Sequence, residues 1–425
     1  MFGIKMKQTI QTRRAFLQKG MTLLALTPTI PTFLDRTMMA MADPLDVKLT
    51  QSLSGKDGKI LVVVQLSGGN DGLNTIIPYA DDLYHRARPA LQHDSKTVHK
   101  IDDHLGLHPN LGGLKKLYDR GMMSIVQGVG YPNPNRSHFR SMDIWHSAQP
   151  EKEVVTSGWL GRYFDNTCKG NDPHVGLSIG DRLPLAMEGD RIQPLSFEKP
   201  ETYRYAGKDV DRYLELNKAN KLVAAEAITP VSQLDFLKRT AMDAQFSSDE
   251  ILRLTRTHAP AASYPFGEFG AGLRTIAAMI NGGLPTRVYY VSLGSFDTHA
   301  QERAVHDRLM QQLSDGVSAF WSDLTAQKND DRVLMMTFSE FGRRVEQNAS
   351  EGTDHGAAAP MMFFGKPLAQ GIIGKHPSLA DLDQGDLKYA IDFRNVYAAV
   401  LENWMETKSA PILGQSFKAT SLFKG

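Results

Sequence analysis

An almost unbroken apolar run, ILVVVQL at residues 60–66, is followed directly by the glycine-rich segment SGGNDG. Such a run predicts a central parallel strand that is covered on both faces. Open α/β sheets bind ligands in the loops at the carboxyl ends of such strands. The carboxylate of Asp71 therefore stands where a functional site is expected, unless the segment is only a turn, which Gly, Asn and Asp all favour.

The glycine-rich segment does not fit a dinucleotide-binding loop. Residues 67–72 lack the first glycine of the G-x-G-x-x-G pattern. Pro78 also interrupts the long helix whose N-terminus would hold the pyrophosphate. Whether this segment is only a turn or part of a functional site depends on which residues follow the other predicted strands.

The first 42 residues predict an export signal. The pair Arg13-Arg14 precedes a short apolar stretch that Pro28 and Pro31 interrupt, so this stretch is a poor membrane-spanning helix. A small-x-small cleavage site ends at Ala42. These features predict a twin-arginine signal peptide over 1–42, cleavage after Ala42, and the twin-arginine export machinery as a partner. The mature chain, 43–425, is then periplasmic or secreted and is not an integral membrane protein.

Charge and cysteine content exclude further classes. The net charge is +1, and residues 1–42 carry six basic residues and one acid, which leaves about −4 for the remainder. A nucleic-acid-binding surface is therefore not expected. Cys168 is the only cysteine, so no intramolecular disulfide can form and stability must come from a packed core.

Alternating strand and helix patterns predict one α/β domain with a mostly parallel sheet over 43–425. Segment 165–264 has weaker strand signals and more charge, and its helical run VSQLDFLKRTAMDAQ at 231–245 favours an insertion or cap outside the central sheet. Strands are predicted at 60–66, 123–130, 287–293, 332–338 and 361–364, and helices at 111–120, from about 137, at 269–280 and at 300–327.

Acids and histidines follow several of these strands. Because parallel strands end at the same sheet edge, the side chains should converge, and they would repel one another or be desolvated without a cation. A divalent metal site is the simplest prediction, with Zn, Mn, Mg or Ca as the ion. Asp71 and Asp354 could instead form turns, Glu340 could be an acid favoured by a helix dipole, and His299 could be a polar loop residue. His306, at the edge of an apolar helix stripe, could be a core-edge histidine with its hydrogen bonds satisfied. The candidate side chains are Asp71, Asp297, His299, Glu340, Asp354 and His355.

Five segments in order resemble the signatures of an exported bacterial family, domain of unknown function 1501. They are LSGGNDGLNTIIPY, NRSHFRSMDIWHS, SFDTHAQE, TFSEFGRR and GTDHGAAAPMMFFG. That family is grouped with the alkaline phosphatase-like superfamily, which includes sulfatases and cofactor-independent phosphoglycerate mutases. The resemblance implies a three-layer α/β/α sandwich with metal ligands at strand ends.

The resemblance also implies roles for individual residues. Ser137 stands where a nucleophile at a helix N-terminus is expected, although it could simply cap that helix. Phe341 replaces a histidine ligand, so one tightly bound ion and a second ion bound weakly or not at all are expected. No Cys-x-Pro-Ser-Arg signature is present, so formylglycine chemistry is not expected. The tight set would be Asp297, His299 and His355, and the loose set Asp71, Glu340 and Ser137.

The function implied is a metal-dependent hydrolase of phosphate or sulfate esters, acting on a small-molecule or polysaccharide substrate. Ser137 would attack, Arg136 or Arg140 would stabilise the ester oxygens, and His138 would protonate the leaving group. The alternative is a non-catalytic periplasmic protein that uses the metal site for structure or for carbohydrate or envelope binding.

Overall fold

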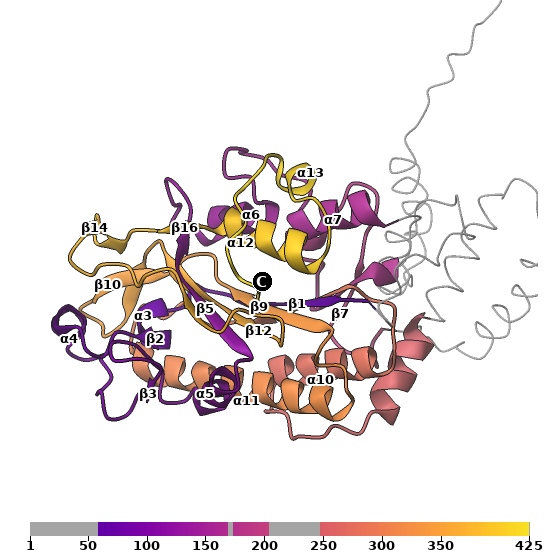
Figure 1. Cartoon of the computed structure of the whole chain (residues 1–425), viewed down its shortest axis with the longest axis horizontal. Helices are drawn as coiled ribbons and strands as arrows, with labels where there is room; N and C mark the ends of the chain where they lie inside the picture. The colour runs from indigo at the N-terminus through magenta and orange to yellow at the C-terminus, as the bar shows by residue number, and fades with distance from the viewer. Residues whose placement is uncertain (1–57, 169–172, 204–246, 425) are drawn as a thin grey trace, which may run out of the picture.

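A computed structural model describes residues 58–168, 173–203 and 247–424 (Figure 1). The predicted signal peptide with its cleavage site, and the helical run predicted at 231–245, lie outside the described residues. Within the described residues, no helix is both long enough and apolar enough to cross a membrane.

Nine strands form the central sheet of the described chain. All neighbouring pairs are parallel except those of β12, which runs antiparallel to both β5 and β9. The order across the sheet is β13 (Gly371–Ile373), β5 (Met123–Gly130), β12 (Ala359–Phe364), β9 (Val333–Phe338), β1 (Ile60–Leu66), β8 (Val288–Leu293), β6 (Gly176–Ile179) and β7 (Leu195–Phe197), with β16 (Ile391–Asp392) beside β5.

Strand β1 is buried over its whole length, as its apolar run predicts. It pairs with β8 on one side and β9 on the other, so both of its backbone edges are hydrogen-bonded. Its side chains alternate between two cores: Val62 packs into the core on one face of the sheet and Val63 into the core on the other.

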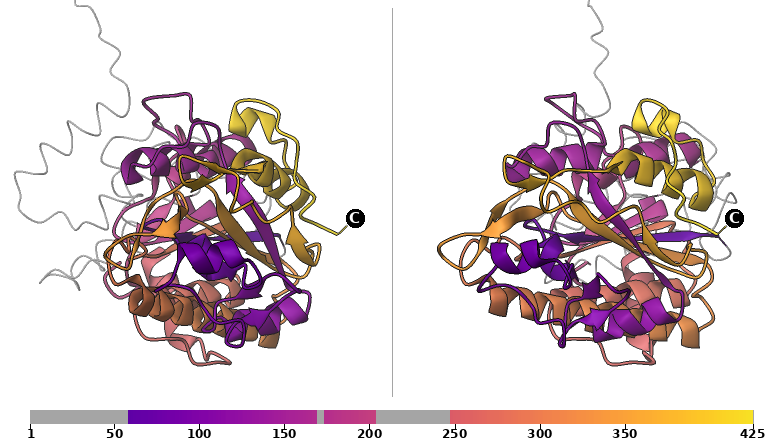
Figure 2. Two further views of the ribbon diagram at one scale, coloured as in Figure 1. Left: turned by 90° about the vertical axis from the view of Figure 1, so that its left-hand side faces the viewer. Right: turned by 60° about the vertical axis from the view of Figure 1, so that its left-hand side comes forward.

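Helices cover both faces of the sheet, and the views in Figures 1 and 2 agree on this layering. The apolar side chains of each helix layer pack into the core on the same face of the sheet. The predicted mixed α/β fold with a mostly parallel sheet between helices is therefore confirmed. One layer holds α5 (Gly112–Asp119), α10 (Glu268–Asn281) and α11 (Glu302–Ala326), and the other holds α6 (His138–Ser147), α7 (Trp159–Thr167), α12 (Phe393–Ala399) with the π-helical turn Val400–Trp404, and α13 (Ala410–Leu413).

Two details of the sheet differ from the expectation. Segment 165–264 contributes β6 and β7 to the edge of the sheet, although its strand signals are weak. These strands are only four and three residues long, too short for a clear periodic pattern. The remaining expectation, that this segment is an insertion or cap, stays a prediction.

Strand β12 is antiparallel, so its first residues, not its last, lie at the edge where the parallel strands end.

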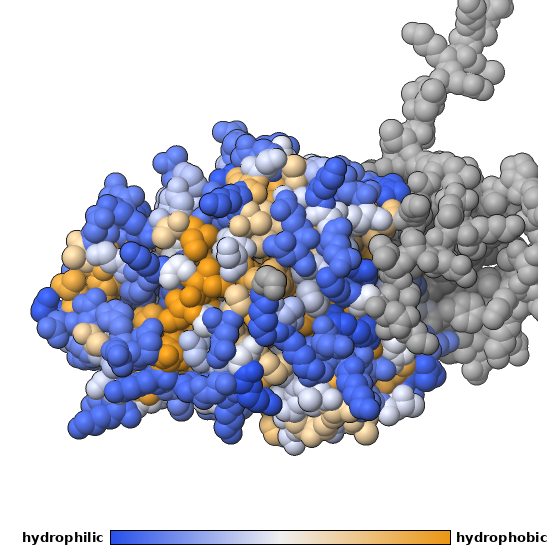
Figure 3. Space-filling model, viewed as in Figure 1, coloured by the Kyte–Doolittle hydropathy of each residue, from blue (hydrophilic) through white to orange (hydrophobic). Residues whose placement is uncertain are grey.

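Short elements gather beyond the carboxyl ends of β1 and β9, at the left in Figure 1. The face seen in Figure 3 is mostly hydrophilic, as expected when the large apolar side chains fill the two cores. The short elements are α3 (Gly72–Thr75), β2 (Ile76–Ile77), α4 (Asp82–Ala87), β3 (His99–Lys100), β4 (Gly106–Leu107), β10 (Arg343–Gln347), β11 (Thr353–His355), β14 (Leu382–Asp383) and β15 (Asp386–Leu387).

Candidate metal centre

Three imidazoles and a carboxylate meet at this edge of the sheet. We call His138, Asp297, His299 and His355 the rim cluster. One ligand atom from each of His138, Asp297 and His355 lies within 4.8 Å of the others. His299 joins them, because its Nε2 is 2.9 Å from Asp297 Oδ1 and 2.9 Å from His355 Nε2. The structure thus brings Asp297, His299 and His355 together and adds His138.

The fold explains why these four residues meet. Asp297 and His299 follow the carboxyl end of β8, and His138 is the first residue of the helix that follows β5. His355 ends β11 and precedes β12, whose antiparallel direction brings its start to the same edge. The loop after β1 approaches them closely: a Cβ on Gly68, where φ is +117°, would lie 2.5 Å from the Asp297 nitrogen.

A buried arginine holds Asp297 in its charged form. The side chain of Arg343 is 0% exposed, and its Nη2 lies 2.8 Å from Asp297 Oδ1. Burial acts to raise the pKa of Asp297, but the hydrogen bond and the positive charge of Arg343 oppose it, and the pKa is lowered to about 2. The side chain of Asp297 is still 46% exposed, so an ionised carboxylate faces the open side of the cluster.

The tautomer of His355 follows from a backbone contact. His355 Nδ1 lies 2.8 Å from the carbonyl oxygen of Arg136, and because a carbonyl can only accept, Nδ1 carries the proton. Burial lowers the pKa of His355, which favours the neutral ring. Its Nε2 therefore has a lone pair, 3.2 Å from Asp297 Oδ1. A lone pair and a carboxylate oxygen repel each other unless a cation or a proton lies between them.

His138 has the same arrangement with a different anchor. Its Nδ1 lies 2.8 Å from Glu340 Oε1, which also accepts the N–H of Gly68 at 2.9 Å. When Glu340 is a carboxylate its oxygens can only accept, and Nδ1 of His138 then carries the proton. Its Nε2 is buried, lies 3.4 Å from Asp297 Oδ2 and has no hydrogen-bond partner.

These donors fit a divalent cation. Metal-binding histidines usually donate their outer N–H to a carboxylate or a backbone carbonyl and keep the other nitrogen for the metal, as His138 and His355 do here. A set of imidazoles with one carboxylate suits zinc better than magnesium or calcium. A proton on His299 could satisfy Asp297 and His355, but it would leave His138 Nε2 without a partner.

Glu340 and Asp71, both predicted as ligands, lie elsewhere. The side chain of Glu340 is 1% exposed and stands behind His138, as the acceptor just described. Asp71 caps α3 by accepting the N–H of Leu73 at 3.2 Å, and its other oxygen accepts from the buried guanidinium of Arg88. Among the described residues, neither acid belongs to a group of three or more acids and histidines close enough to share an ion, and the loose site of Asp71, Glu340 and Ser137 stays a prediction.

The predicted catalytic residues after β5 have varied surroundings. Ser137 is exposed and precedes α6, but its side chain makes no capping hydrogen bond. Arg136 donates from Nε and Nη2 to Asp386 Oδ2, at 2.9 and 2.6 Å. Arg140 donates from Nη2 to the backbone carbonyls of Pro150 and Lys152. Both arginines are thus bound to other parts of the chain.

Phe341 forms a wall behind two of the imidazoles. Its ring is buried, and its centroid lies 4.8 Å from that of His138 and 4.6 Å from that of His355. The sequence indicated only that Phe341 cannot bind a metal. The ring instead packs against two proposed ligands, and a side chain at Gly69, where φ is +77°, would overlap it.

A second group of two histidines and an aspartate, His93, His108 and Asp307, lies deeper; we call it the buried cluster. His108 Nδ1 accepts the backbone N–H of Asn110 at 3.0 Å, so its proton is on Nε2, which lies 2.8 Å from Asp307 Oδ1. His108 therefore has no lone pair left for a metal. His93 is 1% exposed and neither ring nitrogen has a hydrogen-bond partner.

Sequence reasoning did not single out His93 or His108. The buried cluster includes residues from loops with no strand-end pattern, so no sequence signal pointed to it. His306, for which we left a core-edge role open, is buried and its Nε2 lies 3.2 Å from Asn70 Oδ1.

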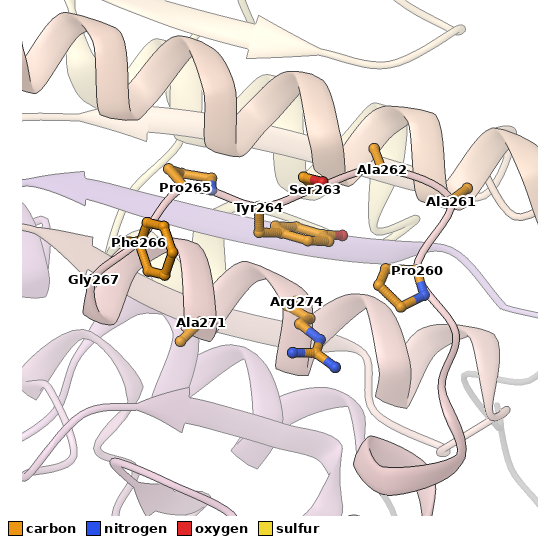
Figure 4. A pocket seen from close by; sticks show the side chains of 10 residues that line it. All are labelled: Pro260, Ala261, Ala262, Ser263, Tyr264, Pro265, Phe266, Gly267, Ala271 and Arg274. Atoms are coloured by element: carbon orange, nitrogen blue, oxygen red, sulfur yellow. The ribbon is translucent and has the colours of Figure 1, made fainter.

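A separate cavity of about 530 Å³ lies on the loop that leads into α10, and Figure 4 shows its side chains. No residue of the rim cluster lines it. Its lining is Pro260, Ala261, Ala262, Ser263, Tyr264, Pro265, Phe266, Gly267, Ala271 and Arg274.

Comparison with known proteins agrees with the family predicted from the motifs. A family model described as a protein of unknown function, DUF1501, matches residues 58–414. No curated protein matches the sequence.

Three solved structures are similar to this chain at low identity. A sulfatase, PsFucS1, from Pseudoalteromonas sp. has 10% identity and a TM-score of 0.38, with 93% of this chain and 78% of that chain covered. A protein in the alkaline phosphatase superfamily from Vibrio parahaemolyticus has 9% identity and a TM-score of 0.36, covering 90% and 77%. The lipoteichoic acid synthase LtaP from Listeria monocytogenes has 10% identity and a TM-score of 0.34, covering 80% and 73%.

Proposed function

This chain belongs to the DUF1501 family of proteins of unknown function, and we propose that it is an exported, metal-dependent hydrolase of phosphate or sulfate esters. The observation that carries the proposal is the buried Nε2 of His138, which faces Asp297 and has no hydrogen-bond partner. The lone pair of His355 faces the same carboxylate. A divalent cation, zinc before manganese, magnesium or calcium, would satisfy all three groups.

In this proposal His138, Asp297 and His355 hold the cation. Glu340 and the carbonyl of Arg136 keep the two imidazoles in the tautomer that leaves Nε2 free. When bound, such a cation polarises an ester oxygen and lowers the pKa of an attacking hydroxyl. Three protein ligands leave a coordination position for substrate, the pattern of catalytic rather than structural zinc sites.

Ser137 is the proposed nucleophile. Its hydroxyl is exposed, is not used to cap α6, and belongs to the residue directly before His138. The N-terminus of this ten-residue helix favours the negative charge of a phosphate or sulfate group. In the reaction the Ser137 hydroxyl would lose its proton to solvent and its oxygen would form a bond to phosphorus or sulfur while the bond to the leaving alcohol breaks. Water would then break the new bond, releasing the acid and returning a proton to Ser137.

His299 is the proposed proton donor to the leaving alcohol, a role that the sequence assigned to His138. Both ring nitrogens of His138 are committed, one to Glu340 and one to the cation site. In His299, Nε2 lies within the rim cluster, whereas Nδ1 faces the exposed carboxylate of Asp354 at 3.4 Å, so this ring has no buried acceptor behind it. Its side chain is 45% exposed, the most open of the three imidazoles.

The test combines metal analysis with turnover. Purified mature protein, the His355→Ala variant and the His299→Ala variant are assayed for bound metal and for hydrolysis of aryl phosphate, phosphodiester and aryl sulfate substrates. We expect His355→Ala to lose both metal and turnover, and His299→Ala to keep metal but lose turnover. Equal metal content in the wild type and His355→Ala would overturn the proposal.

The commitment of both arginines to other parts of the chain favours a second candidate, a non-catalytic protein that uses the metal site for structure or carbohydrate binding. Arg136 and Arg140 make their contacts within the chain, so neither stands free for an ester oxygen. Metal binding that His355→Ala abolishes, together with no turnover on any of these ester classes, would favour this candidate.

We also infer export by the twin-arginine route, with cleavage after Ala42 and a periplasmic or secreted mature chain. Replacing Arg13-Arg14 by Lys-Lys should leave uncleaved precursor in the cytoplasm. Mature protein at normal levels outside the cytoplasm would contradict this inference.

A further inference from the structure

We propose that Asp386, on the β14–β15 hairpin, is a positioning residue for the metal centre. Through Arg136 it holds in place the carbonyl group that selects the metal-binding tautomer of His355. The inference rests on the proposed metal site, but it also makes a claim about the metal-free protein, which can be tested separately.

Asp386 is a buried carboxylate whose main partner is one arginine. Its side chain is 2% exposed, and its Oδ2 accepts from Nε and Nη2 of Arg136 at 2.9 and 2.6 Å. Nε of Arg344 is 3.6 Å from Oδ1, beyond hydrogen-bond distance. A buried carboxylate is costly unless it is paired, so the contact with Arg136 is strongly favoured and ties the hairpin to the loop before α6.

Arg136 transmits this contact to the rim cluster. It lies in the loop 131–137 between β5 and α6, outside any helix or strand. Its guanidinium contacts Asp386, while its backbone carbonyl accepts the Nδ1 proton of His355 at 2.8 Å. The direction of that carbonyl therefore depends on the anchor of the side chain.

The two proposed imidazole ligands differ in how they are held. The acceptor for His138 is the carboxylate of Glu340, which is itself held by the Gly68 N–H. The acceptor for His355 is a loop carbonyl that depends on Asp386. If the carbonyl turns away, the proton of neutral His355 can move to Nε2, and the ring can no longer bind a cation through that atom. Loss of such outer contacts typically weakens metal binding about 10–100-fold.

The hairpin offers a matched control. Asp383 is the cross-strand partner of Asp386 in β14, but its side chain is exposed. Asp386→Asn and Asp383→Asn make the same chemical change on the same hairpin, and only the first removes the charge that Arg136 contacts.

The experiment compares wild type, Asp386→Asn and Asp383→Asn in full-length mature protein. Zinc affinity is measured by competition with a chromophoric chelator. We expect Asp386→Asn to bind zinc about tenfold more weakly, and Asp383→Asn to match the wild type. Thermal melting of the metal-free proteins shows whether each variant folds. If Asp386→Asn does not fold, Arg136→Lys replaces it, because this variant keeps the positive charge but loses the two-point contact with Asp386.

The tautomer is measured directly by ¹⁵N NMR of histidine-labelled, metal-free protein, with the His355 signals identified by His355→Gln. In Asp386→Asn we expect His355 to lose its preference for the Nδ1 proton while His138 keeps it. Unchanged His355 signals, or equal shifts in both histidines, would overturn the inference. If the wild type binds no zinc, the metal proposal fails, and the NMR comparison still decides the role of Asp386.

Discussion

The rim cluster and the buried cluster contain the same residue types, yet only one suits a metal ion. In the rim cluster, His138 and His355 donate their Nδ1 protons outward, to a carboxylate and to a carbonyl. In the buried cluster, His108 accepts a backbone N–H at Nδ1 and donates from Nε2 to Asp307. The comparison teaches that the proton on each ring, rather than the presence of two histidines and an acid, decides whether lone pairs are left for a cation.

The surroundings of the two clusters differ as well. Asp297 at the rim is half-exposed and held by Arg343, whereas the buried cluster lies beside a network of buried acids. There, Arg88 outweighs the effect of burial and keeps the pKa of Asp71 low, while burial and the charge of Asp71 raise the pKa of Glu302. Glu302 also accepts from the Thr353 hydroxyl at 2.6 Å, which joins α11 to β11. We therefore expect changes near the buried cluster to affect folding, and changes at the rim to affect metal binding.

The largest expected effect comes from Arg88→Met. It leaves the carboxylate of Asp71 buried without its counter-charge, which typically costs about 3–5 kcal/mol of the free energy of unfolding. Urea denaturation of the metal-free protein measures this. Lys115→Met, which breaks an exposed pair with Asp119, is the control and should change stability little. Similar losses of unfolding free energy in the two variants would mean that the buried ion pair contributes no more to stability than an exposed one.

At the rim, His355→Ala should abolish tight zinc binding, because it removes one of three proposed ligands. The matched change His108→Ala in the buried cluster should leave zinc affinity unchanged and lower the stability of the metal-free protein. Equilibrium zinc titration and denaturation of both variants give the comparison. Weaker zinc binding in His108→Ala than in His355→Ala would reverse our assignment of the two clusters.

Metal removal should lower the melting temperature of the wild type, because it removes the ion that the rim cluster is proposed to bind. At zinc one hundred times above its dissociation constant, binding adds about 2.7 kcal/mol of stability. Chelator should remove that stabilisation from the wild type and from His108→Ala, but should have no effect on His138→Ala. Melting curves with and without chelator measure it, and a chelator effect that persists in His138→Ala would place the ion elsewhere.

Acid should lower stability through buried histidines, and His93 of the buried cluster is one of them; burial also lowers the pKa of His146, His306 and His376. Burial, helped by the neighbouring His108, lowers the pKa of His93 to about 3 from its ordinary value of 6.5. Below pH 6.5 the unfolded chain then binds a proton that the folded chain excludes, so stability falls as the pH drops towards 3, by up to about 1.4 kcal/mol per pH unit. His93→Phe should reduce this slope, and it should be no less stable at neutral pH because it removes two unpartnered nitrogens. If the unfolding free energy of His93→Phe depends on pH with the same slope as that of the wild type, the role of His93 in acid sensitivity is contradicted.

Local patterns were sufficient for much of the architecture. The apolar run of β1 predicted a buried central strand, and alternating periods predicted helices over most of α5, α10 and α11. The same logic predicted that Asp297, His299 and His355 would meet at one sheet edge, because strand direction determines where a following loop lies. The strands β6 and β7 were not predicted, because segments of four and three residues are too short to show a clear alternation of apolar and polar side chains.

What the sequence by itself determined is which side chains reach the carboxyl edge of the sheet, since period and residue type are local properties. Only the tertiary structure decided what each one does there. Asp71 follows its strand as predicted, but its pairing with Arg88 turns it into a cap and a buried ion pair. Glu340 and His138 are 202 positions apart, and their contact makes one an anchor and the other a candidate ligand. The physical reason is that a hydrogen bond assigns a proton only when both partners are in place, and no local pattern records a partner so far along the chain.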